Sequence, residues 1–457
     1  MRSIREPEQE IPILTEADVV VVGGGTTGPF AAISAARQGA DVVLVERYGT
    51  LGGLLTLGLN SRPSGALLGG LPREVWDLAR QAGGASEGYA ATVKADKLRI
   101  DSPSDPQIMK ILLTRLCVES GVRLLFDCVV SRPWVEGSAV KGVIVENKAG
   151  RQFIGAKVVI DCSADGDVAA RAGAPFVLGS GIDEIMQPAS MYFTVGPVDL
   201  PEVARWARDN IAEVKDYNIP ENDEELGYGL WLHGFQRMLR SFQEETGIRL
   251  QREYISIKTA NGAVYVNATR VVGYNPFLPL QASEAVIECY RQIEAYARFF
   301  KEKVPGFEKA HITQIAPFVG ARESRHIQGE YILTADDVLV GRSFDDSIAA
   351  DAGALDIHEV NGVNVDFQRL PPYEIPYRCL VPVNVDQILV AGRCISADHV
   401  AHGRTRNMPA CMATGQAAGV AASIAVKSNA LVRNLNVERI QELLRGIGMP
   451  VKAGDIS

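Results

Sequence analysis

Apolar and polar positions along the first fifty residues follow the periods of a strand, a helix and a second strand. Residues 19–22 are four consecutive valines, which is typical of a strand buried on both faces of a parallel sheet. The alanine-rich stretch 29–38 predicts a helix that ends at Gly39, and 41–45 predicts the second strand. We therefore expect a strand–helix–strand unit of a parallel α/β sheet.

The turn between the first strand and the helix carries three glycines, Gly23, Gly25 and Gly28, with the spacing G-x-G-x-x-G. One glycine makes such a turn, one lets a pyrophosphate approach the backbone, and one lets helix and strand pack closely. Glu46 follows about twenty positions later, where a carboxylate can accept hydrogen bonds from a ribose. The glycines alone also fit a plain tight turn, but with the flanking elements and the acid they predict dinucleotide binding.

Residues 47–186 alternate between turns, helices and short strands. A second glycine turn at Gly52 and Gly53 either passes over cofactor phosphates or is an ordinary loop. Helices are predicted over 73–81 and, after a start at Asp105, over 107–120. The parallel sheet is expected to resume at 157–160, after an antiparallel β-meander formed by strands at 122–126, 129–135, 139–146 and 152–154.

The second half of the chain has a different pattern until it returns to the sheet. Amphipathic helices are predicted at 200–212, 230–246 and 283–303, the last capped by Ser283, and short strands at 254–258 and 263–267. No second G-x-G-x-x-G occurs here, so a substrate site is expected rather than a nicotinamide domain. A buried strand at 387–391 then follows, and after it a small-residue helix at 408–426. The N-terminus of this helix would favour a bound anion.

These patterns divide the chain into a nucleotide-binding domain and a substrate domain. The nucleotide-binding domain is expected in three segments, 1–54, 105–186 and 367–457. An excursion at 55–104 separates the first two segments, and the substrate domain occupies 187–366.

Composition and charge exclude several classes of function. The chain has 457 residues, of which 47% are hydrophobic, and a net charge of −9 without a run of like charge, which argues against nucleic-acid binding. The first 17 residues have no apolar core of a secretory signal, and no window of about 18 apolar residues predicts a membrane span. Seven scattered cysteines without a C-x-x-C pair are expected to be reduced thiols of a cytoplasmic protein, and they argue against a redox-active pair or an iron–sulfur cluster in this chain.

A series of motifs resembles the FAD-dependent oxidoreductase family whose FAD domain is like that of glutathione reductase, and more distantly the fumarate reductase and succinate dehydrogenase flavoproteins. The motifs lie at 18–28, 46–47 with 51–53, 160–167, 320–325, 373–377, 389–396 and 406–419. The resemblance implies an α/β fold: a Rossmann-like, glutathione-reductase-type FAD-binding domain with an inserted β-meander, and an α+β substrate domain. It also implies FAD, non-covalently bound, because 53–64 has no match to the histidine loop that carries covalent FAD.

The residues expected to contact FAD come from each segment of the nucleotide-binding domain. Arg393 stands where many FAD proteins have the aspartate that holds the ribityl chain, so that contact must come from the backbone or from another side chain. The full expected set is Gly23, Gly25, Thr27, Gly28, Glu46, Arg47, Gly52, Gly53, Val129, Ala164, Asp165, Gly392, Arg393, Ala410 and Met412.

Candidates for the chemistry lie in 396–407, which is expected to be a loop over the flavin. His399 or His402 could take a proton as hydride passes to the flavin N5, or both could merely hold the loop. Arg404 and Arg406 could bind a substrate carboxylate, as a similarly placed arginine does in the fumarate reductase flavoproteins, or form a salt bridge in the wall of the site.

The remaining polar clusters are interpreted more plainly. Arg322, Glu323, Arg325 and His326 predict a structural network in which neighbouring charges satisfy one another. Alternate positions on a strand supply only two ligands, so the histidine and acids at 356–359 predict no metal site, and no metal is expected elsewhere.

The expected function is hydride transfer between flavin N5 and a small polar substrate that carries a hydroxyl, an amine or a carboxylate. The alternative is a flavin-binding electron-transfer subunit of a larger redox complex. The partners are a small-molecule substrate and an electron acceptor that the sequence does not identify, and homo-oligomerisation is left open.

Overall fold

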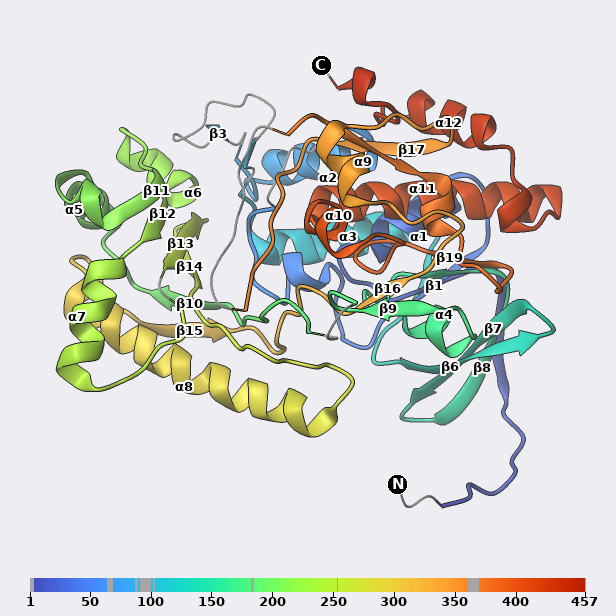
Figure 1. Cartoon of the computed structure of the whole chain (residues 1–457), viewed down its shortest axis with the longest axis horizontal. Helices are drawn as coiled ribbons and strands as arrows, with labels where there is room; N and C mark the ends of the chain where they lie inside the picture. Colours follow the sequence, from blue (N-terminus) through green and yellow to red (C-terminus); the bar gives the residue numbers. More distant parts are fainter. Residues whose placement is uncertain are drawn as a thin grey trace.

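The computed structural model describes residues 4–63, 69–86, 89–90, 100–101, 103–181, 185–252, 254–360 and 370–456. The chain forms two halves side by side (Figure 1), one built on the N- and C-terminal segments and the other on the middle of the chain. The expected domain boundary at 366 and much of the excursion after residue 86 lie outside the described residues.

The first half is a Rossmann-like α/β layer, as the sequence predicts. In the described part of the chain its sheet has seven strands, in the order β5-β2-β1-β8-β7-β6 with β19 also beside β8. The strands are β1 (Ile13–Val22), β2 (Val42–Val45), β5 (Arg123–Leu125), β6 (Val129–Glu136), β7 (Ala139–Asn147), β8 (Gly150–Asp161) and β19 (Ile388–Val390). The valines of β1 are at most 4% exposed, because parallel strands flank them on both sides.

Two of the predicted strands change their role in the structure. The separate strands expected at 152–154 and 157–160 are one strand, β8, which pairs antiparallel with β7 and parallel with β1. No turn residue separates them except Gly155, which stays in register opposite Glu16 of β1. The strand expected at 122–126 in the meander is β5, and it pairs parallel with β2 at the edge of the sheet.

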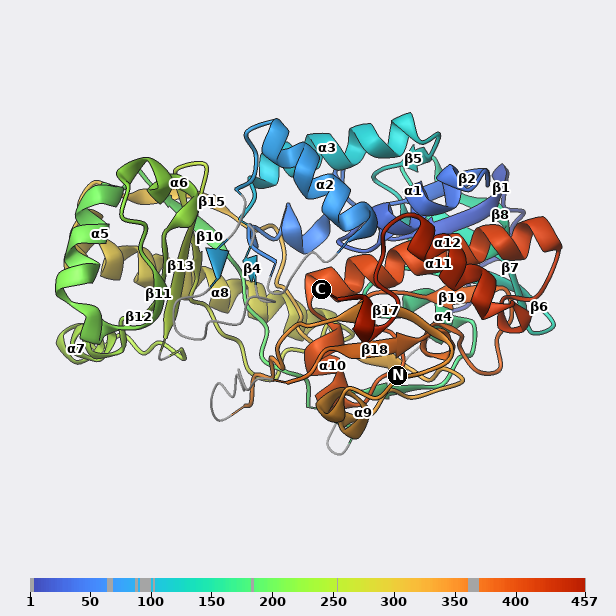
Figure 2. The same cartoon turned by 90° about the horizontal axis from the view of Figure 1, so that it is seen from above.

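Helices pack against this sheet from the two ends of the chain. Helix α1 (Gly28–Arg37) lies along α11 (Met408–Ser428), as Figure 2 shows from above. Helix α11 is long and apolar enough to cross a membrane by composition, but 83% of that stretch is buried, which is the behaviour of a core helix. The other helices of this half are α2 (Gly70–Gln81), α3 (Pro106–Glu119), α4 (Asp167–Arg171), α9 (Ala335–Val340), α10 (His399–Thr405) and α12 (Val437–Gly446).

The second half is a sheet covered by helices, which confirms the α+β character expected for it. Six strands are ordered β11-β12-β13-β14-β10-β15 in the described residues, namely β10 (Phe193–Gly196), β11 (Val214–Asn218), β12 (Trp231–Gly234), β13 (Ile255–Ala260), β14 (Ala263–Asn267) and β15 (His311–Ile315). The helices are α5 (Leu200–Asp209), α6 (Leu226–Gly229), α7 (Gln236–Thr246) and α8 (Pro279–Lys303). The aromatic rings of α7 and α8 form their own core, apart from that of the Rossmann-like half.

Two helix predictions are wrong in their bounds, and one predicted loop contains a helix. The helix expected at 230–246 is strand β12 followed by α7, and Phe235 between them has φ of 70°. Helix α8 begins at Pro279, so Ser283 lies inside it and its hydroxyl donates to the Pro279 carbonyl instead of capping the helix. The loop expected over 396–407 contains helix α10, whose N-cap is Asp398.

The described residues also form smaller elements. They are β3 (Tyr89–Ala90), β4 (Ile100–Asp101), β9 (Phe176–Leu178), β16 (Arg325–Ile327), β17 (Ser347–Asp351), β18 (Tyr373–Pro376), and 3-10 turns at Gly53–Leu55, Ile211–Glu213, Asp223–Glu225, Tyr377–Leu380, Val432–Asn434 and Ala453–Asp455.

Candidate functional site

The glycine turn after β1 has the three properties that dinucleotide binding requires. Gly23 has φ of 96°, and a Cβ there would lie 2.6 Å from the Cys162 carbonyl oxygen. A Cβ on Gly28 would collide with the Gly23 carbonyl, because α1 starts directly against the strand. Gly25, in contrast, has nothing within 4 Å of an added Cβ, so its backbone faces open space.

The second glycine turn lies against the first one. The Gly52 amide donates to the Gly24 carbonyl at 2.8 Å, and the Thr26 hydroxyl donates to the Gly52 carbonyl at 3.2 Å. A Cβ on Gly53 would lie 2.8 Å from the Gly25 Cα, so only glycine allows this approach. These contacts favour a place at the cofactor over an ordinary loop for the turn.

Two backbone amides of this double turn are without a partner among the described residues. In this part of the chain, the Gly25 and Thr26 amides donate no hydrogen bond. The two amides stand immediately before α1, where the helix dipole favours a negative charge. A pyrophosphate would supply the acceptors that they lack.

Glu46, the residue expected to bind a ribose, holds the glycine turn through its carboxylate. It is 7% exposed, and its two carboxylate oxygens accept hydrogen bonds from the Gly24 amide at 2.6 Å and the Tyr48 amide at 2.8 Å. Burial raises the pKa of Glu46, while these amides act in the opposite direction. Each oxygen keeps a second lone pair for a hydroxyl, so the observed contacts do not conflict with the expected role. Arg47 packs with its guanidinium carbon 5.4 Å from the centre of the Tyr48 ring.

The C-terminal segment packs onto the same turn. Gly392 has φ of 84°, and a Cβ there would collide with the Thr27 side chain. A Cβ on Gly415 of α11 would lie 2.6 Å from the Thr27 carbonyl oxygen. Ala410 and Met412, near the start of α11, are fully buried. The strand, the glycine turn and the last core helix therefore meet at Thr27, as expected for a segment that completes a cofactor site.

Arg393 forms a salt bridge with Asp165, another residue that is expected to contact FAD. Its Nη2 lies 2.6 Å from Asp165 Oδ1, which also accepts a hydrogen bond from the Ser324 hydroxyl at 2.6 Å. Ala164, just before Asp165, has φ of 69° in this turn. Val129, at the start of β6, is 48% exposed. These positions leave the expected cofactor roles of Ala164, Asp165, Arg393 and Val129 as predictions.

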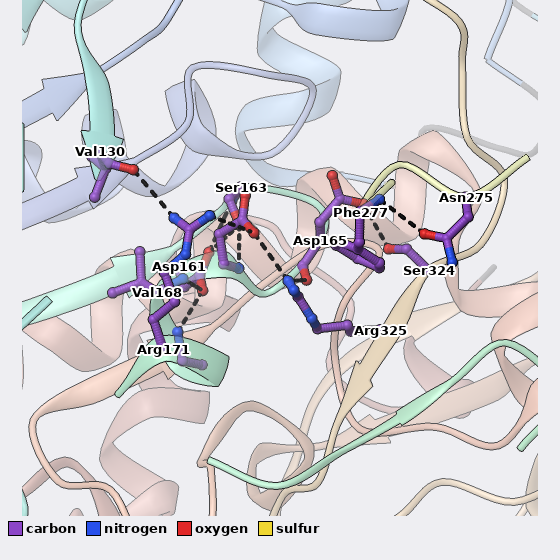
Figure 3. A network of polar contacts seen from close by, with 12 residues as sticks. Val130, Asp161, Ser163, Asp165, Val168, Arg171, Asn275, Phe277, Ser324 and Arg325 are labelled. Carbon is purple, nitrogen blue, oxygen red and sulfur yellow. Dashed lines mark hydrogen bonds and ion pairs between the residues drawn. The ribbon is translucent and has the colours of Figure 1, made fainter. Parts of the chain in front are cut away.

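Figure 3 shows how the turn after β8 is tied to the segment at 324–325. Asp161 accepts hydrogen bonds from the Ser163 hydroxyl and from the Val168 amide, which shape the turn. Arg325 donates to the Asp165 carbonyl at 3.1 Å and pairs with Asp167 at 3.0 Å. The network predicted at 322–326 is therefore only partly correct. Glu323 pairs with His326 within the segment, but Arg322 donates to the Pro188 carbonyl and Arg325 pairs with the turn after β8, because the fold brings these distant partners closer than the neighbours along the chain.

His399 and His402 lie on α10 and differ strongly in environment. His399 is partly exposed, and its Nδ1 lies 2.7 Å from Glu323 Oε1. This hydrogen bond raises the pKa of His399, against the effect of burial. His402 is fully buried, and burial together with the neighbouring His326 lowers its pKa well below the ordinary value. Of the two, His399 has the geometry of an acid–base group.

Glu323 joins these histidines to β16. Its carboxylate is 3.0 Å from His326 Nε2 as well as 2.7 Å from His399. Burial alone would raise the pKa of Glu323, but the hydrogen bonds from His326 and His399 hold it well below its usual range. The carboxylate therefore stays ionised in the interior.

Arg404 has a different role from the one expected for it. The side chain is fully buried, and its guanidinium donates to the backbone carbonyls of Gly353 and Pro371 at 2.9 Å and 3.0 Å and to that of Val338. It also lies 4.2 Å from the centre of the Tyr373 ring. Since backbone carbonyls hold this cation inside the protein, we reassign Arg404 from substrate binding to fixing the segments around α10.

Arg406 takes part in a cluster that joins the two halves of the protein. Its Nη2 lies 2.8 Å from Asp356 Oδ2, which is the salt bridge considered from the sequence. Asp356 also lies 3.0 Å from His358 Nε2. Burial would raise the pKa of Asp356, but Arg406 and His358 hold it well below its ordinary value. Burial lowers the pKa of His358 to about 3, so this imidazole is neutral.

Two further arginines belong to the same cluster, which we call the arginine cluster (Arg252, Arg322 and Arg406). Burial, together with the positive charges of Arg252 and Arg406, lowers the pKa of Arg322 to about 9. Arg252 is 6% exposed and donates to Asn267 Oδ1 on β14. Sequence reasoning missed Arg252, because a lone arginine before β13 has no local signal and the fold alone brings it here.

Comparison with known proteins identifies the family. The model of a family described as FAD dependent oxidoreductase matches residues 18–444. No curated protein matches the sequence. The structure is similar to a geranylgeranyl bacteriochlorophyll reductase-like protein from Thermoplasma acidophilum, at 13% identity and a TM-score of 0.47 over 97% of this chain and 94% of that chain. It is also similar to L-proline dehydrogenase from P. horikoshii, at 12% identity and a TM-score of 0.41 over 95% and 99% of the two chains. A third similar structure is the p-nitrophenol 4-monooxygenase of Pseudomonas putida DLL-E4, at 11% identity and a TM-score of 0.45 over 94% and 83%.

Proposed function

The chain belongs to the FAD-dependent oxidoreductase family, and on that premise we propose that it moves a hydride between FAD and a small polar substrate that carries a carboxylate. The reacting carbon of the substrate would carry a hydroxyl or an amine. FAD, when bound, supplies N5 as the atom that exchanges the hydride. The residues of the chain would bind the carboxylate, orient the carbon and move the proton.

The observation that carries this proposal is the arginine cluster. Among the described residues, Asp356 is the carboxylate whose charge acts on Arg252, Arg322 and Arg406 together. Enclosing an excess of cations costs free energy unless an anion compensates them. A substrate carboxylate would provide that anion, and a guanidinium can donate to both of its oxygens at once.

His399 supports the second part of the proposal, the movement of a proton. Its Nδ1 is 2.7 Å from Glu323, so in the neutral ring Nδ1 carries the proton that is donated to the carboxylate. The other ring nitrogen, Nε2, is then the proton acceptor. Because the side chain is 24% exposed, it can exchange that proton with solvent. His402 does not share this role, since it is enclosed on all sides.

The proposal is tested by anaerobic mixing of the FAD-loaded protein with paired compounds. Each pair consists of a hydroxy acid or amino acid and its methyl ester or amide, so that only the charge of the carboxylate differs. We expect acids to bleach the oxidised flavin band and their neutral partners to do so at least tenfold more slowly. Equal rates for both members of every pair would contradict carboxylate binding by the arginine cluster.

Variants of the cluster connect this result to particular residues. Arg406→Lys should keep FAD and its colour but slow the bleaching, because an ammonium cannot donate to both carboxylate oxygens in one plane. The matched control is Arg378→Lys, at an arginine paired with Asp346 away from the cluster. If no small molecule bleaches the flavin and a reduced partner protein does, the electron-transfer subunit becomes the better reading.

A further inference from the structure

Three buried side chains meet between β16 and α10, and of these the proposed function uses only Glu323, as the partner of His399. Glu323, His326 and His402 are 1%, 3% and 0% exposed, and one possible ligand atom from each lies within 4.8 Å of the others. Glu323 Oε1 is 3.0 Å from His326 Nε2 and 3.9 Å from His402 Nδ1. We call these residues the Glu–His cluster.

His402 lacks the partners that a buried imidazole requires. Its ring lies edge to face with that of His326, with the centroids 4.5 Å apart. In the described part of the chain, neither of its nitrogens has a hydrogen-bond partner. Buried polar atoms are nearly always paired, so two unpaired nitrogens beside a carboxylate indicate that something else binds there.

We propose that Glu323, His326 and His402 bind a divalent first-row transition-metal ion. Two imidazoles and one carboxylate form a ligand set that Zn²⁺ and Fe²⁺ use. Metal–ligand bonds of about 2.0–2.2 Å in a tetrahedral site place the ligand atoms roughly 3.4 Å apart. The separations of 3.0 Å and 3.9 Å from Glu323 lie on either side of this value, and all three ligand atoms lie within 4.8 Å of one another, so side-chain rotations can bring them to one ion. Three protein ligands leave a position for water or a further ligand.

The charges around the Glu–His cluster are compatible with a cation. Glu323 contributes a negative charge and both imidazoles can bind in the neutral form. The nearest arginines are already paired, Arg393 with Asp165 at 2.6 Å and Arg406 with Asp356 at 2.8 Å. They therefore repel an added cation less than free guanidinium groups would.

The ligands come from elements that are fixed in place. The segment at 324–325 is tied to the turn after β8 (Figure 3). Asp398 caps α10 through the Ala401 amide at 2.7 Å and also accepts from the Ala335 amide at 2.7 Å. His399 donates to Glu323 Oε1, and the Gln187 amide donates to Glu323 Oε2 at 3.1 Å, so hydrogen bonds to both oxygens orient this ligand. The partial exposure of His399 marks the side from which an ion could enter.

The test measures metal binding by the FAD-loaded protein purified without a polyhistidine tag. After chelation and dialysis, the protein is titrated with Zn²⁺ and with Co²⁺, and bound metal, melting temperature and visible absorption beyond the flavin bands are recorded. We expect one equivalent to bind, the melting temperature to rise, and Co²⁺ to show the intense bands of a low-symmetry site. His402→Leu, which fills the buried site with an apolar side chain, should bind at least a hundredfold more weakly. His311→Leu, an exposed histidine on β15, is the matched control and should bind like the parent.

Two results would overturn the proposal. One is a parent protein that takes up no more metal than His402→Leu, and the other is a His311→Leu variant that loses binding as His402→Leu does. If His402→Leu does not fold, Glu323→Gln replaces it, with the same expected loss. Because the readouts do not involve substrate, metal binding without bleaching by any acid would support this site and count against the proposed function, and bleaching without metal binding would do the reverse.

Discussion

Replacing Glu46 should separate its two tasks, holding the glycine turn and holding the ribose. The carboxylate accepts hydrogen bonds from the buried Gly24 amide at 2.6 Å and from the partly buried Tyr48 amide at 2.8 Å. Glu46→Ala removes both acceptors, whereas Glu46→Gln keeps one carbonyl oxygen and presents an N–H to the other amide. An unsatisfied buried amide costs about 1–3 kcal/mol. We therefore expect the flavin-free protein to lose about 1–3 kcal/mol of unfolding free energy in Glu46→Gln and about twice that in Glu46→Ala.

The affinity for FAD should fall in the same order. Loss of a charge-assisted hydrogen bond to the ribose removes about 1.5–3 kcal/mol, which corresponds to about one to two decades in Kd. Glutamine retains an acceptor for one hydroxyl, so its loss should be the smaller one. Quenching of flavin fluorescence in a titration of the flavin-free protein measures these values, and denaturant unfolding measures the stability.

A matched control distinguishes this reasoning from a general effect of removing an acid. Glu74, on α2, pairs with Arg37 at 2.7 Å, and both side chains are 41% exposed. An exposed pair of this kind contributes about 0–1 kcal/mol, so Glu74→Ala should bind FAD like the parent. If Glu46→Ala and Glu74→Ala behave alike in both measurements, Glu46 neither holds the turn nor meets the ribose.

The remaining predictions concern the cofactor and the backbone around it. FAD should be released completely into the supernatant by acid precipitation, and colour in the pellet would show a covalent bond. Gly25→Ala should fold with nearly parental stability, because no atom of the described part of the chain lies within 4 Å of the added Cβ. It should bind FAD at least tenfold more weakly, because the pyrophosphate would fill that space. An FAD affinity equal to that of the parent would place the phosphates elsewhere. Gly28→Ala should instead lower the melting temperature of the flavin-free protein, since its Cβ collides with the Gly23 carbonyl. Arg404→Lys should lower the melting temperature more than Arg406→Lys does, because lysine cannot reach the carbonyls that Arg404 holds, and thermal unfolding of both variants checks the order.

Local patterns predicted the Rossmann-like half well. The four consecutive valines that end β1, directly before the glycine turn, allow few arrangements other than a buried parallel strand. In the same way, the small residues of α11 favour a core helix. Glu46, which directly follows β2, was identified from its distance along the chain to the glycines of the first turn, because strand and helix lengths fix that distance. Backbone geometry of this kind is encoded within about thirty residues, which a local pattern can cover.

Element bounds in the second half were predicted less well. The stretch 230–246 carries a helical pattern throughout, yet its first part pairs as β12 between β11 and β13. Tertiary pairing decides such cases, because the hydrogen bonds of a strand come from distant residues that a local pattern does not contain. For the same reason, the strand at 122–126 was placed in the meander although it pairs with β2.

The sequence by itself determined the cofactor fold and the residue types available for chemistry, and the tertiary structure decided how those residues are grouped. It divided the polar residues of 396–407 into His399 beside Glu323, Arg404 among backbone carbonyls, and Arg406 in the arginine cluster. It also brought His326 and His402 together across 76 positions of the chain. Charges and ligands act over a few ångströms in space whatever their separation along the chain, so only the folded packing of β16 against α10 could reveal these groups.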